Sequence, residues 1–398
     1  MKFDVRYLVC GVLIAASSFG IWRWATAYFD NAVPIVVIKG IESDAFYAGE
    51  LSCSIDSSRT GEVSMWLDDK PLVNHFKVSK HDASCPFIIP TNSLVDGKHL
   101  LKVLFTDNSF YRNKVTIERT FNVDNILLKA AIVTTDSEFK VFQGRTLHVQ
   151  FQANKPLRLA KIMALSGEYI CPAESKGSLI YEAFVPIACE EKPNEYLFSI
   201  EAADHVGNIS RLESKFQVLA YPFKKQSIVI DPAKIKEEDN LGKTPQELQN
   251  VIDCLTEQSP QDKLWRGAFC TPIDIQRITC DFGTIRTTQH KGRYVHKALD
   301  VINAPKSIVW STQDGIVVAM DRFSSSGKTV IVDHGLGLLS LFFHLDEFAK
   351  IAVGQRIAKG SPVGTIGKTG EATGYHLHWE MRLANIQIDP MQWTRMVL

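Results

Sequence analysis

The chain has 398 residues, which is enough for two to four domains. Its 44 basic and 44 acidic residues give a formal net charge of zero, so the charge balance offers no support for nucleic-acid binding. With 45% hydrophobic residues and no low-complexity tract, the composition is that of a globular protein.

Residues 1–30 carry the signs of a membrane or export segment. After two basic residues, the chain runs without charge from Tyr7 to Trp22. Such a run predicts a signal anchor or a signal peptide. We favour an uncleaved transmembrane helix at residues 7–24 that anchors the protein to the inner membrane; cleavage near Ala27, which would release it, is the alternative. Both place the remaining chain in the periplasm or cell envelope.

Short apolar bursts separated by turn signals follow up to about residue 220. Leu100–Phe105, for example, alternates after the turn dipeptide Asp96-Gly97. No stretch with a helical period of useful length interrupts the first of these bursts, between residues 31 and 124. The spacing predicts small β-sandwiches.

An internal repeat divides this part of the chain in two. Aligning Asp107 with Asp204 places two sets of alternating apolar residues in phase, Leu101, Val103 and Phe105 with Phe198, Ile200 and Ala202. We expect these to be the inward positions of equivalent strands. The pattern resembles bacterial immunoglobulin-like modules, which implies one such domain at residues 31–125 and a second at residues 126–220.

The cysteines after Cys10 fall into three groups, Cys53 and Cys85, Cys171 and Cys189, and Cys254, Cys270 and Cys280. Each of the first two groups lies within one predicted domain, as the disulfides of an exported protein would. In the third group we prefer a Cys270–Cys280 pair, which leaves Cys254 over. Buried free thiols are the alternative. No cysteine spacing is typical of a zinc finger, so we do not expect thiolates to hold a metal.

Residues 221–262 predict a linker. Lys234–Asn240 is a charged, solvated connector, and Thr244 followed by Pro245 predicts the start of a short packing helix. From residue 263 to 398 the pattern is β-rich and punctuated by glycines, which predicts a compact antiparallel sheet. The predicted fold class is therefore all-β, with two sandwiches and a C-terminal sheet domain behind one N-terminal helix.

Four histidines and one carboxylate in the C-terminal part predict a metal site. His296 and Asp300 are four residues apart, and the surrounding β signals favour a shared face of one strand. His376 and His378 share a face of another strand. If these strands are neighbours, three side chains can bind one ion and leave a fourth position open, as in catalytic zinc sites. His344 and the remaining histidine could accept a water proton or stabilise an oxyanion.

From Trp265 to Trp393 the sequence resembles the lysostaphin/LytM-type zinc metallopeptidases. The resemblance rests on an ordered set of motifs, which includes Asp281–Arg286, His296–Asp300, His344-Leu345, Gly364–Gly370 and Thr373–Glu380. It implies a Zn²⁺ ion with three ligands, His296, Asp300 and His378. It also implies two catalytic histidines, His344 and His376. The implied activity is hydrolysis of peptide cross-links in bacterial peptidoglycan.

Three positions depart from the family pattern. Ala298 replaces the glycine of the HxGxD motif, Phe342-Phe343 replaces Tyr-Ala before His344, and Tyr375 stands where proline or serine precedes the HxH motif. We expect these residues to line the site and to narrow the groove or change the choice of substrate. His334, also common in the family, is expected to be structural.

Three functions compete. The first is an active exported zinc endopeptidase whose partner is the peptidoglycan cross-link, with membrane contact only through an uncleaved N-terminal segment. The second is a non-catalytic relative that binds the wall or activates another hydrolase. The third is an adhesion or scaffold protein that acts through its immunoglobulin-like repeats. We favour the first, because all five key residues are present. The envelope location favours direct cross-links over glycine bridges.

Overall fold

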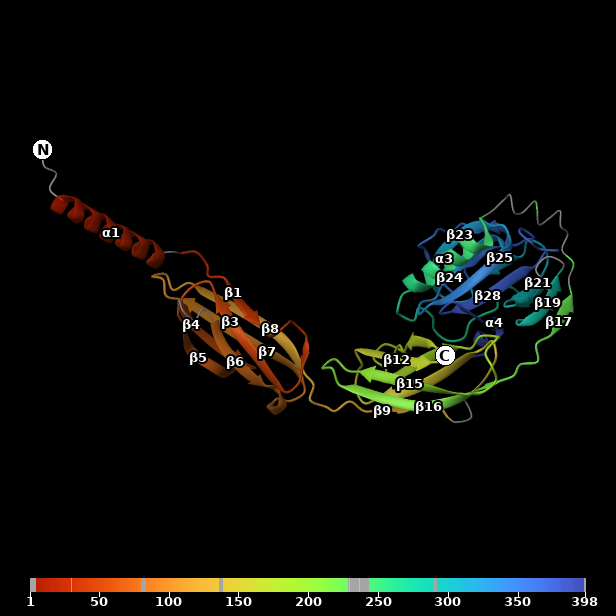
Figure 1. Cartoon of the computed structure of the whole chain (residues 1–398), viewed down its shortest axis with the longest axis horizontal. Helices are drawn as coiled ribbons and strands as arrows, with labels where there is room; N and C mark the ends of the chain where they lie inside the picture. Colours follow the sequence, from red (N-terminus) through yellow and green to blue (C-terminus); the bar gives the residue numbers. More distant parts are fainter. Residues whose placement is uncertain are drawn as a thin grey trace. The chain divides into compact units, whose positions relative to one another are not determined.

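The computed structural model describes residues 5–29, 31–79, 84–135, 139–227, 229, 236, 243–288 and 292–396. Apart from residue 236, the predicted connector at residues 234–240 lies outside this description. Strands dominate the described chain (Figure 1), which confirms a mainly β protein. The chain divides into two compact units, Met1–Leu127 with His205–Asn208, and Leu128–Asp204 with Ile209–Leu398.

The first unit begins with helix α1 (Val5–Tyr28). Within the part of the chain that the structure describes, no helix is long and apolar enough to cross a membrane. The membrane anchor therefore stays a prediction from the sequence.

Two sheets make up the rest of the first unit and enclose one apolar core between them. The three-stranded sheet contains β1 (Val36–Lys39), β3 (Glu50–Ser57) and β6 (Ser84–Pro90). The five-stranded sheet has the order β2 (Phe46–Tyr47), β8 (Lys114–Val123), β7 (Gly97–Asp107), β4 (Gly61–Leu67), β5 (Lys70–Val78). A 3₁₀ turn, η1 (Thr91–Ser93), follows β6.

The second unit opens with a second sandwich, which again pairs a five-stranded sheet with a three-stranded one. Its five-stranded sheet has the order β10 (Lys140–Phe142), β16 (Ile209–Leu219), β15 (Glu195–Ala203), β12 (Leu159–Ala164), β13 (Gly167–Ile170). The three-stranded sheet consists of β14 (Ile180–Pro186), β11 (Thr146–Ala153) and β9 (Ala130–Ile132). In β7 and β15 the repeat's inward positions are all buried, which confirms the predicted Leu101, Val103 and Phe105 and their counterparts Phe198, Ile200 and Ala202.

The predicted disulfides are wrong, because every cysteine from Cys53 onward is a free thiol. Across β3 and β6, Cys53 lies opposite Phe87 and Cys85 lies opposite Ile55, so the two cysteines are diagonal neighbours. Diagonal side chains on adjacent strands are about 7–8 Å apart, beyond ordinary disulfide geometry.

The other predicted pairs fail because their members lie in different surroundings. Cys171 packs in the core of the second sandwich, whereas Cys189 packs in the core of the C-terminal region. The thiol of Cys270 donates to the carbonyl of Ser311, away from Cys280.

The C-terminal region is built on a ten-stranded sheet and a three-stranded one. The main path of the larger sheet is β18 (Arg277–Cys280), β21 (Leu299–Ile302), β28 (Leu377–Leu383), β25 (Leu338–Phe348), β24 (Gly327–Asp333), β23 (Gly315–Phe323), β26 (Arg356–Ile357). Off this path, β27 (Pro362–Ile366) pairs with β25 and with β22 (Ile308–Trp310), and β28 pairs with β29 (Ile386–Ile388). The smaller sheet has the order β17 (Lys225–Ser227), β19 (Thr284–Thr288), β20 (Gly292–His296).

Two helices flank these sheets, α3 (Pro245–Gln258) and α4 (Pro390–Trp393). The predicted start of α3 is confirmed: the Thr244 hydroxyl accepts from the Glu247 amide and the Glu247 carboxylate accepts from the Thr244 amide, a capping box. The apolar face of α3 buries Leu248 and Ile252 against the large sheet. The helix is therefore a packing element, as its sequence predicts.

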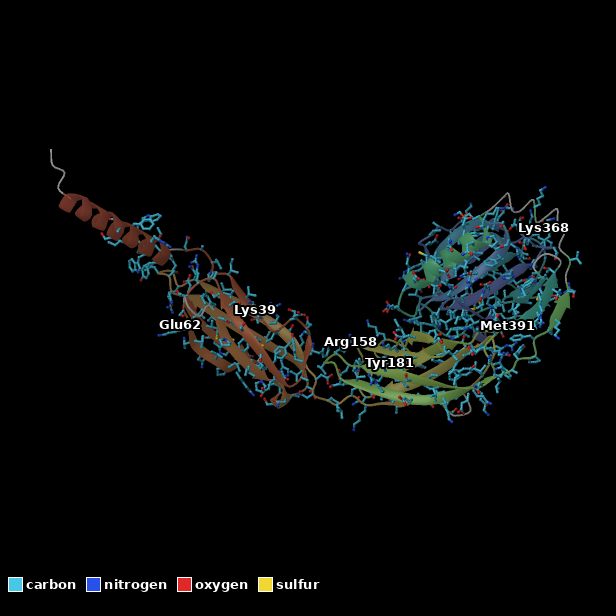
Figure 2. The ribbon with its side chains drawn as sticks, in the orientation of Figure 1. Lys39, Glu62, Arg158, Tyr181, Lys368 and Met391 are labelled. Atoms are coloured by element: carbon cyan, nitrogen blue, oxygen red, sulfur yellow. The ribbon has the colours of Figure 1, made fainter. Side chains whose placement is uncertain are left out.

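Within the second unit, the second sandwich packs against the core of the C-terminal region. The ring of Phe184 on β14 lies 5.7 Å from that of Trp265 and 5.6 Å from that of Trp393. The amide group of Gln392 donates to the carbonyl of Thr146 and accepts from its N–H, both at 2.7 Å. Figure 2 shows the side chains of this unit, with Tyr181 of the sandwich and Met391 of the C-terminal region labelled.

A buried ion pair lies at the same contact. The ammonium of Lys263 pairs with Glu182, and their side chains are 9% and 1% exposed. His148 lies 3.1 Å from the other oxygen of Glu182. Burial would raise the pKa of Glu182, but hydrogen bonds from His148 and Lys263 hold it below its usual value. The carboxylate therefore stays charged within the protein.

We expect Lys263→Met to lower the free energy of unfolding by about 3–5 kcal/mol, because it leaves a buried carboxylate without its main partner. The exposed pair between Lys161 and Glu168, 3.0 Å apart, supplies the matched control, since Lys161→Met should cost less than about 1 kcal/mol. Urea unfolding followed by tryptophan fluorescence measures both. Equal losses in the two variants would contradict a stabilising role for the buried pair.

Candidate active site

Two adjacent strands bring the predicted metal ligands together. Asp300 on β21 lies directly opposite His378 on β28, so these strands are neighbours, as the sequence analysis requires. The expectation that His296 shares a strand with Asp300 is wrong. His296 ends β20 in the small sheet, and the chain passes into the large sheet before Asp300. Crossing between sheets, rather than alternation along one strand, places the two side chains together.

Three donor atoms meet at this point. His296 Nε2 and His378 Nδ1 each lie 3.1 Å from Asp300 Oδ1. Ligand atoms of a tetrahedral zinc ion, at about 2.0–2.2 Å from the metal, are roughly 3.3–3.6 Å from one another. Among the described residues, the buried Nε2 of His296 has no hydrogen-bond partner. Both distances to Asp300 Oδ1 are close to this spacing, so the donor set fits a divalent metal ion.

Arg286 on β19 orients this cluster and was given no role from the sequence. Its Nη2 donates to Asp300 Oδ2 at 2.7 Å, which leaves Oδ1 facing the imidazoles. Its Nη1 lies 3.0 Å from His296 Nδ1, and its Nε donates to Gln226. Arg286 ends the Asp281–Arg286 motif, which is the only sequence signal that points to it.

Glu380 follows His378 on the site face of β28 and was also missed. Its carboxylate lies 3.6 Å from His378 Nε2 and is held by Arg382. The alternation His376, His378, Glu380 along one strand face could have identified it. Burial would raise the pKa of Glu380, but Arg382 and His378 hold it at about 2.

Burial and charge set opposite protonation states for the clustered groups. Burial would raise the pKa of Asp300, but the adjacent His296 and His378 hold it well below its usual value. Burial would lower the pKa of His378, yet the carboxylates of Asp300 and Glu380 raise this pKa to about 9. Burial lowers the pKa of His296 to about 4. At pH 7 the proton on His378 therefore balances the charge of Asp300, and a metal ion held by this cluster would displace that proton.

The two remaining histidines point bare nitrogens toward the same place. His344 Nδ1–H donates to the carbonyl of Thr369 at 2.7 Å, and His376 Nδ1–H donates to the carbonyl of Gly374 at 2.9 Å. Each bond fixes the tautomer and leaves a lone pair on Nε2. His376 Nε2 lies 3.8 Å from Asp300 Oδ1. The ring centres of His344 and His376 are 4.7 Å apart. Burial lowers the pKa of both histidines, so both are neutral at pH 7.

A β-bulge aims His344 into the site. Between β24 and β25 the register shifts from Val330–Phe342 to Lys328–Leu345, so β25 holds one extra residue. His344 lies in this bulge and has a φ of 61°, which is in the left-handed region that non-glycine residues seldom adopt. Bulges and strained backbone of this kind gather next to active sites.

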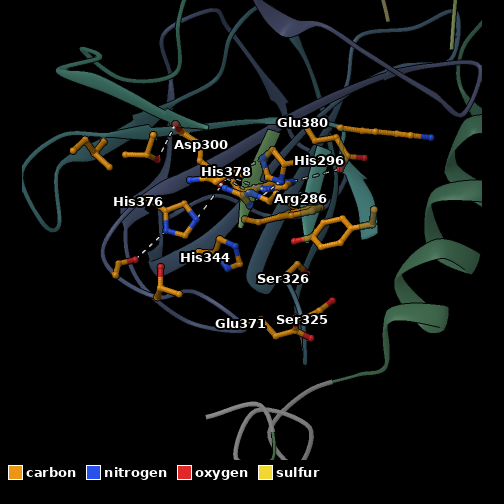
Figure 3. A pocket seen from close by; sticks show the side chains of 18 of the residues that line it. Arg286, His296, Asp300, Ser325, Ser326, His344, Glu371, His376, His378 and Glu380 are labelled. Carbon is orange, nitrogen blue, oxygen red and sulfur yellow. Dashed lines mark hydrogen bonds and ion pairs between the residues drawn. The ribbon is translucent and has the colours of Figure 1, made fainter. Parts of the chain in front are cut away.

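A cleft of about 540 Å³ opens over these side chains. Figure 3 shows His344 and His376 beside the Asp300, His296 and His378 cluster, with Ser325, Ser326 and Glu371 nearby. Phe343 and Tyr375 line the cleft as predicted, and Phe343 stacks on His378 with ring centres 4.9 Å apart. Phe342 and Ala298 do not line it, because both are fully buried in the interior.

Comparison with known proteins places this site within one family. Residues 294–390 match the model of Peptidase family M23. This part of the chain is a peptidase M23 domain. The matched segment contains all five predicted site residues, His296, Asp300, His344, His376 and His378.

Among curated relatives, the peptidoglycan DD-endopeptidase ShyC of Vibrio cholerae serotype O1 is 27% identical over 121 residues, 30% of this chain and 28% of ShyC. ShyB of the same organism, also a peptidoglycan DD-endopeptidase, is 30% identical over 124 residues, 30% of this chain and 29% of ShyB. The chain thus matches less than a third of the length of these relatives. Among solved structures, the catalytic domain of lysostaphin from Staphylococcus simulans is 18% identical, with a TM-score of 0.25, covering 36% of this chain and 97% of that one.

A thiol lies close to two of the predicted metal ligands. The Sγ of Cys280 and ligand atoms of His296 and Asp300 all lie within 4.8 Å of one another. Burial raises the pKa of Cys280 to about 11, so the group is a neutral thiol at pH 7. Thiols bind zinc as thiolates. The carboxylate and imidazoles are therefore the better donors, and Cys280 is a neighbour to be tested.

His334 lies in the M23 domain but away from the cleft. It is fully buried; its Nδ1–H donates to the carbonyl of Asp314 at 2.7 Å, and its Nε2 accepts from the Ser340 hydroxyl at 2.8 Å. With both nitrogens used within the fold, its role is structural. Burial lowers its pKa to about 4.

We expect acid to destabilise the protein through His334. The unfolded chain protonates this residue below about pH 6.5, whereas the folded chain does so only near pH 4. The contribution of His334 to the free energy of unfolding is therefore fully present above pH 6.5, and it falls by about 2 kcal/mol between pH 7.5 and pH 5. Urea unfolding of the wild type and His334→Gln at both values measures it. The variant should be less stable at pH 7.5 but lose less on acidification; equal losses would contradict the prediction.

Proposed function

We propose that the protein is an exported zinc metalloendopeptidase that hydrolyses peptide cross-links of bacterial peptidoglycan. The observation that carries the proposal is the convergence of His296 Nε2, Asp300 Oδ1 and His378 Nδ1 at one point, with two neutral histidines beside them in a cleft. Peptidase family M23 membership of residues 294–390 supports the reaction class.

We assign the zinc ligands as His296, Asp300 and His378. When bound, Zn²⁺ supplies Lewis-acid polarisation of the scissile carbonyl and makes water acidic enough to attack at neutral pH. Arg286 orients Asp300 through its bond to Oδ2. Glu380 holds the His378 ring from its other nitrogen. These two residues position the ligands rather than touch the substrate.

We assign proton transfer to His344 and His376. Each carries its ring proton on Nδ1, where a backbone carbonyl accepts it, so each Nε2 can accept a proton from the attacking water. The imidazolium so formed can donate a proton to the leaving amine or stabilise the oxyanion. The strained backbone of His344 fixes its direction before substrate arrives.

The wall is the proposed substrate. The relatives ShyC and ShyB are named peptidoglycan DD-endopeptidases, which supports a cross-link as the target here. We propose direct peptide cross-links over glycine bridges, and a location in the periplasm or cell envelope with residues 7–24 as anchor. The two sandwiches, proposed immunoglobulin-like domains at residues 31–125 and 126–220, would hold the peptidase away from the membrane.

The test is release of soluble muropeptides from purified sacculi by the full chain, with and without a chelator. We expect release from directly cross-linked wall, loss of release with chelator, and recovery on addition of zinc. Release from glycine-bridged wall alone would overturn the proposed cross-link. Bound zinc without release from either wall would instead favour a wall-binding or hydrolase-activating protein.

A further inference from the structure

Among the described residues that line the cleft, one basic side chain is neither used by the proposed mechanism nor paired with an acid. Three basic side chains line the cleft, Arg277, Arg286 and Lys297. Arg286 is paired with Asp300, and Lys297 with Glu190 at 2.8 Å. Within the described ranges, the side chain of Arg277 has no hydrogen bond or ion pair, and it is exposed to the cleft. Its charge is therefore available to a ligand.

Sheet register places Arg277 close to the reacting centre. On β18 it lies opposite Ile302 of β21, two residues from Asp300 and on the same face of the sheet. One strand spacing and two residues of rise separate the Cα atoms of Arg277 and Asp300 by about 8 Å. Val301 pairs with Leu377, so Arg277 stands on the side of the site where His376 lies.

The other charges near the centre are already balanced. Arg286 neutralises Asp300, and Arg382 neutralises Glu380. A metal ion with a single carboxylate ligand leaves this region positive. A guanidinium at the rim adds a planar pair of N–H donors that matches a carboxylate in both spacing and charge. A ligand with a neutral amide in place of this carboxylate could accept only part of these hydrogen bonds.

We propose that Arg277 is a specificity residue that binds a free carboxylate of the peptide next to the scissile bond. The enzyme would then prefer cross-links whose neighbouring carboxylate is free to those in which it is amidated. The inference rests on the proposed function, and it adds the chemical class of the group recognised beside the cut bond.

The experiment compares two synthetic cross-linked peptides that differ only in whether this carboxylate is free or amidated. Cleavage is measured as kcat/KM for the full-length wild type, Arg277→Gln, Arg277→Lys and Arg293→Gln. Arg293 is an exposed arginine of β20 outside the cleft, which makes it the matched control. Binding of both peptides, labelled with a fluorophore, is measured by anisotropy on the same proteins, so that recognition is tested even without turnover.

We expect Arg277→Gln to lower kcat/KM and affinity for the free carboxylate about 10- to 100-fold, and those for the amidated peptide less than about threefold. Arg277→Lys should recover part of the loss, and Arg293→Gln should match wild type. Equal losses on both peptides, or none, would overturn the inference while leaving the proposed function intact. Discrimination in binding without cleavage by the wild type would refute the proposed activity but retain the carboxylate site.

Discussion

Replacing His376 with alanine is expected to lower the rate of cross-link cleavage by about 10²–10⁴-fold while the metal stays bound. The residue is not among the three proposed ligands, and its Nε2 lone pair lies 3.8 Å from Asp300 Oδ1, beside the point where the donor atoms meet. His344→Ala should have a loss of similar size, because the two rings, 4.7 Å apart, face the same space.

Muropeptide release and zinc content per chain, measured on the same preparations, check this prediction. The control is His75→Asn, since the His75 side chain is 79% exposed in the first sandwich and asparagine tolerates its positive φ. Loss of activity together with loss of zinc in His376→Ala would instead make His376 a ligand. Full activity in both alanine variants would contradict the proposed proton transfer by these two histidines.

The second large effect separates two sets of metal ligands that share His296 and Asp300. If His378 completes the set, His378→Ala should weaken zinc binding by more than about 100-fold, beyond the loss typical of an outer-shell residue, and abolish cleavage. Cys280→Ser should keep zinc and most of the activity, because the thiol is buried and protonated. Competition against a chromophoric zinc chelator measures both affinities.

The opposite order of zinc affinities would favour the second set of ligands. Strong loss of zinc in Cys280→Ser, with little change in His378→Ala, would show that the cluster of Cys280, His296 and Asp300 holds the metal. His378 would then belong to the proton-transfer groups. Circular dichroism of each variant separates a ligand effect from unfolding.

Local patterns predicted much of this molecule. Alternation alone identified the buried positions of β7 and β15, and a cap residue followed by proline located the start of α3. The short spacing of His376 and His378 placed both beside the site, because His376 directly precedes β28, His378 lies on it, and both line the cleft. These features depend on neighbours a few residues away, which a sequence displays directly.

Features set by distant pairing were missed or mistaken. The crossing from β20 to β21 places His296 beside Asp300, and no spacing rule describes it. Arg286 reaches the ligands only because β19 pairs with β20. The bulge that turns His344 depends on one extra residue relative to β24. The disulfide predictions failed for the same reason, since pairing within a domain does not fix the register of two strands.

The packing of the second sandwich against the C-terminal region has a practical consequence for anyone who wishes to shorten this protein. A fragment that starts at residue 263 would leave the aromatic surface of Trp265 and Trp393 without Phe184, and would lose β17, which pairs with β19 beside Arg286. Uncovered aromatic patches of this kind favour aggregation. A soluble minimal fragment should therefore begin near Leu128 and retain the second sandwich.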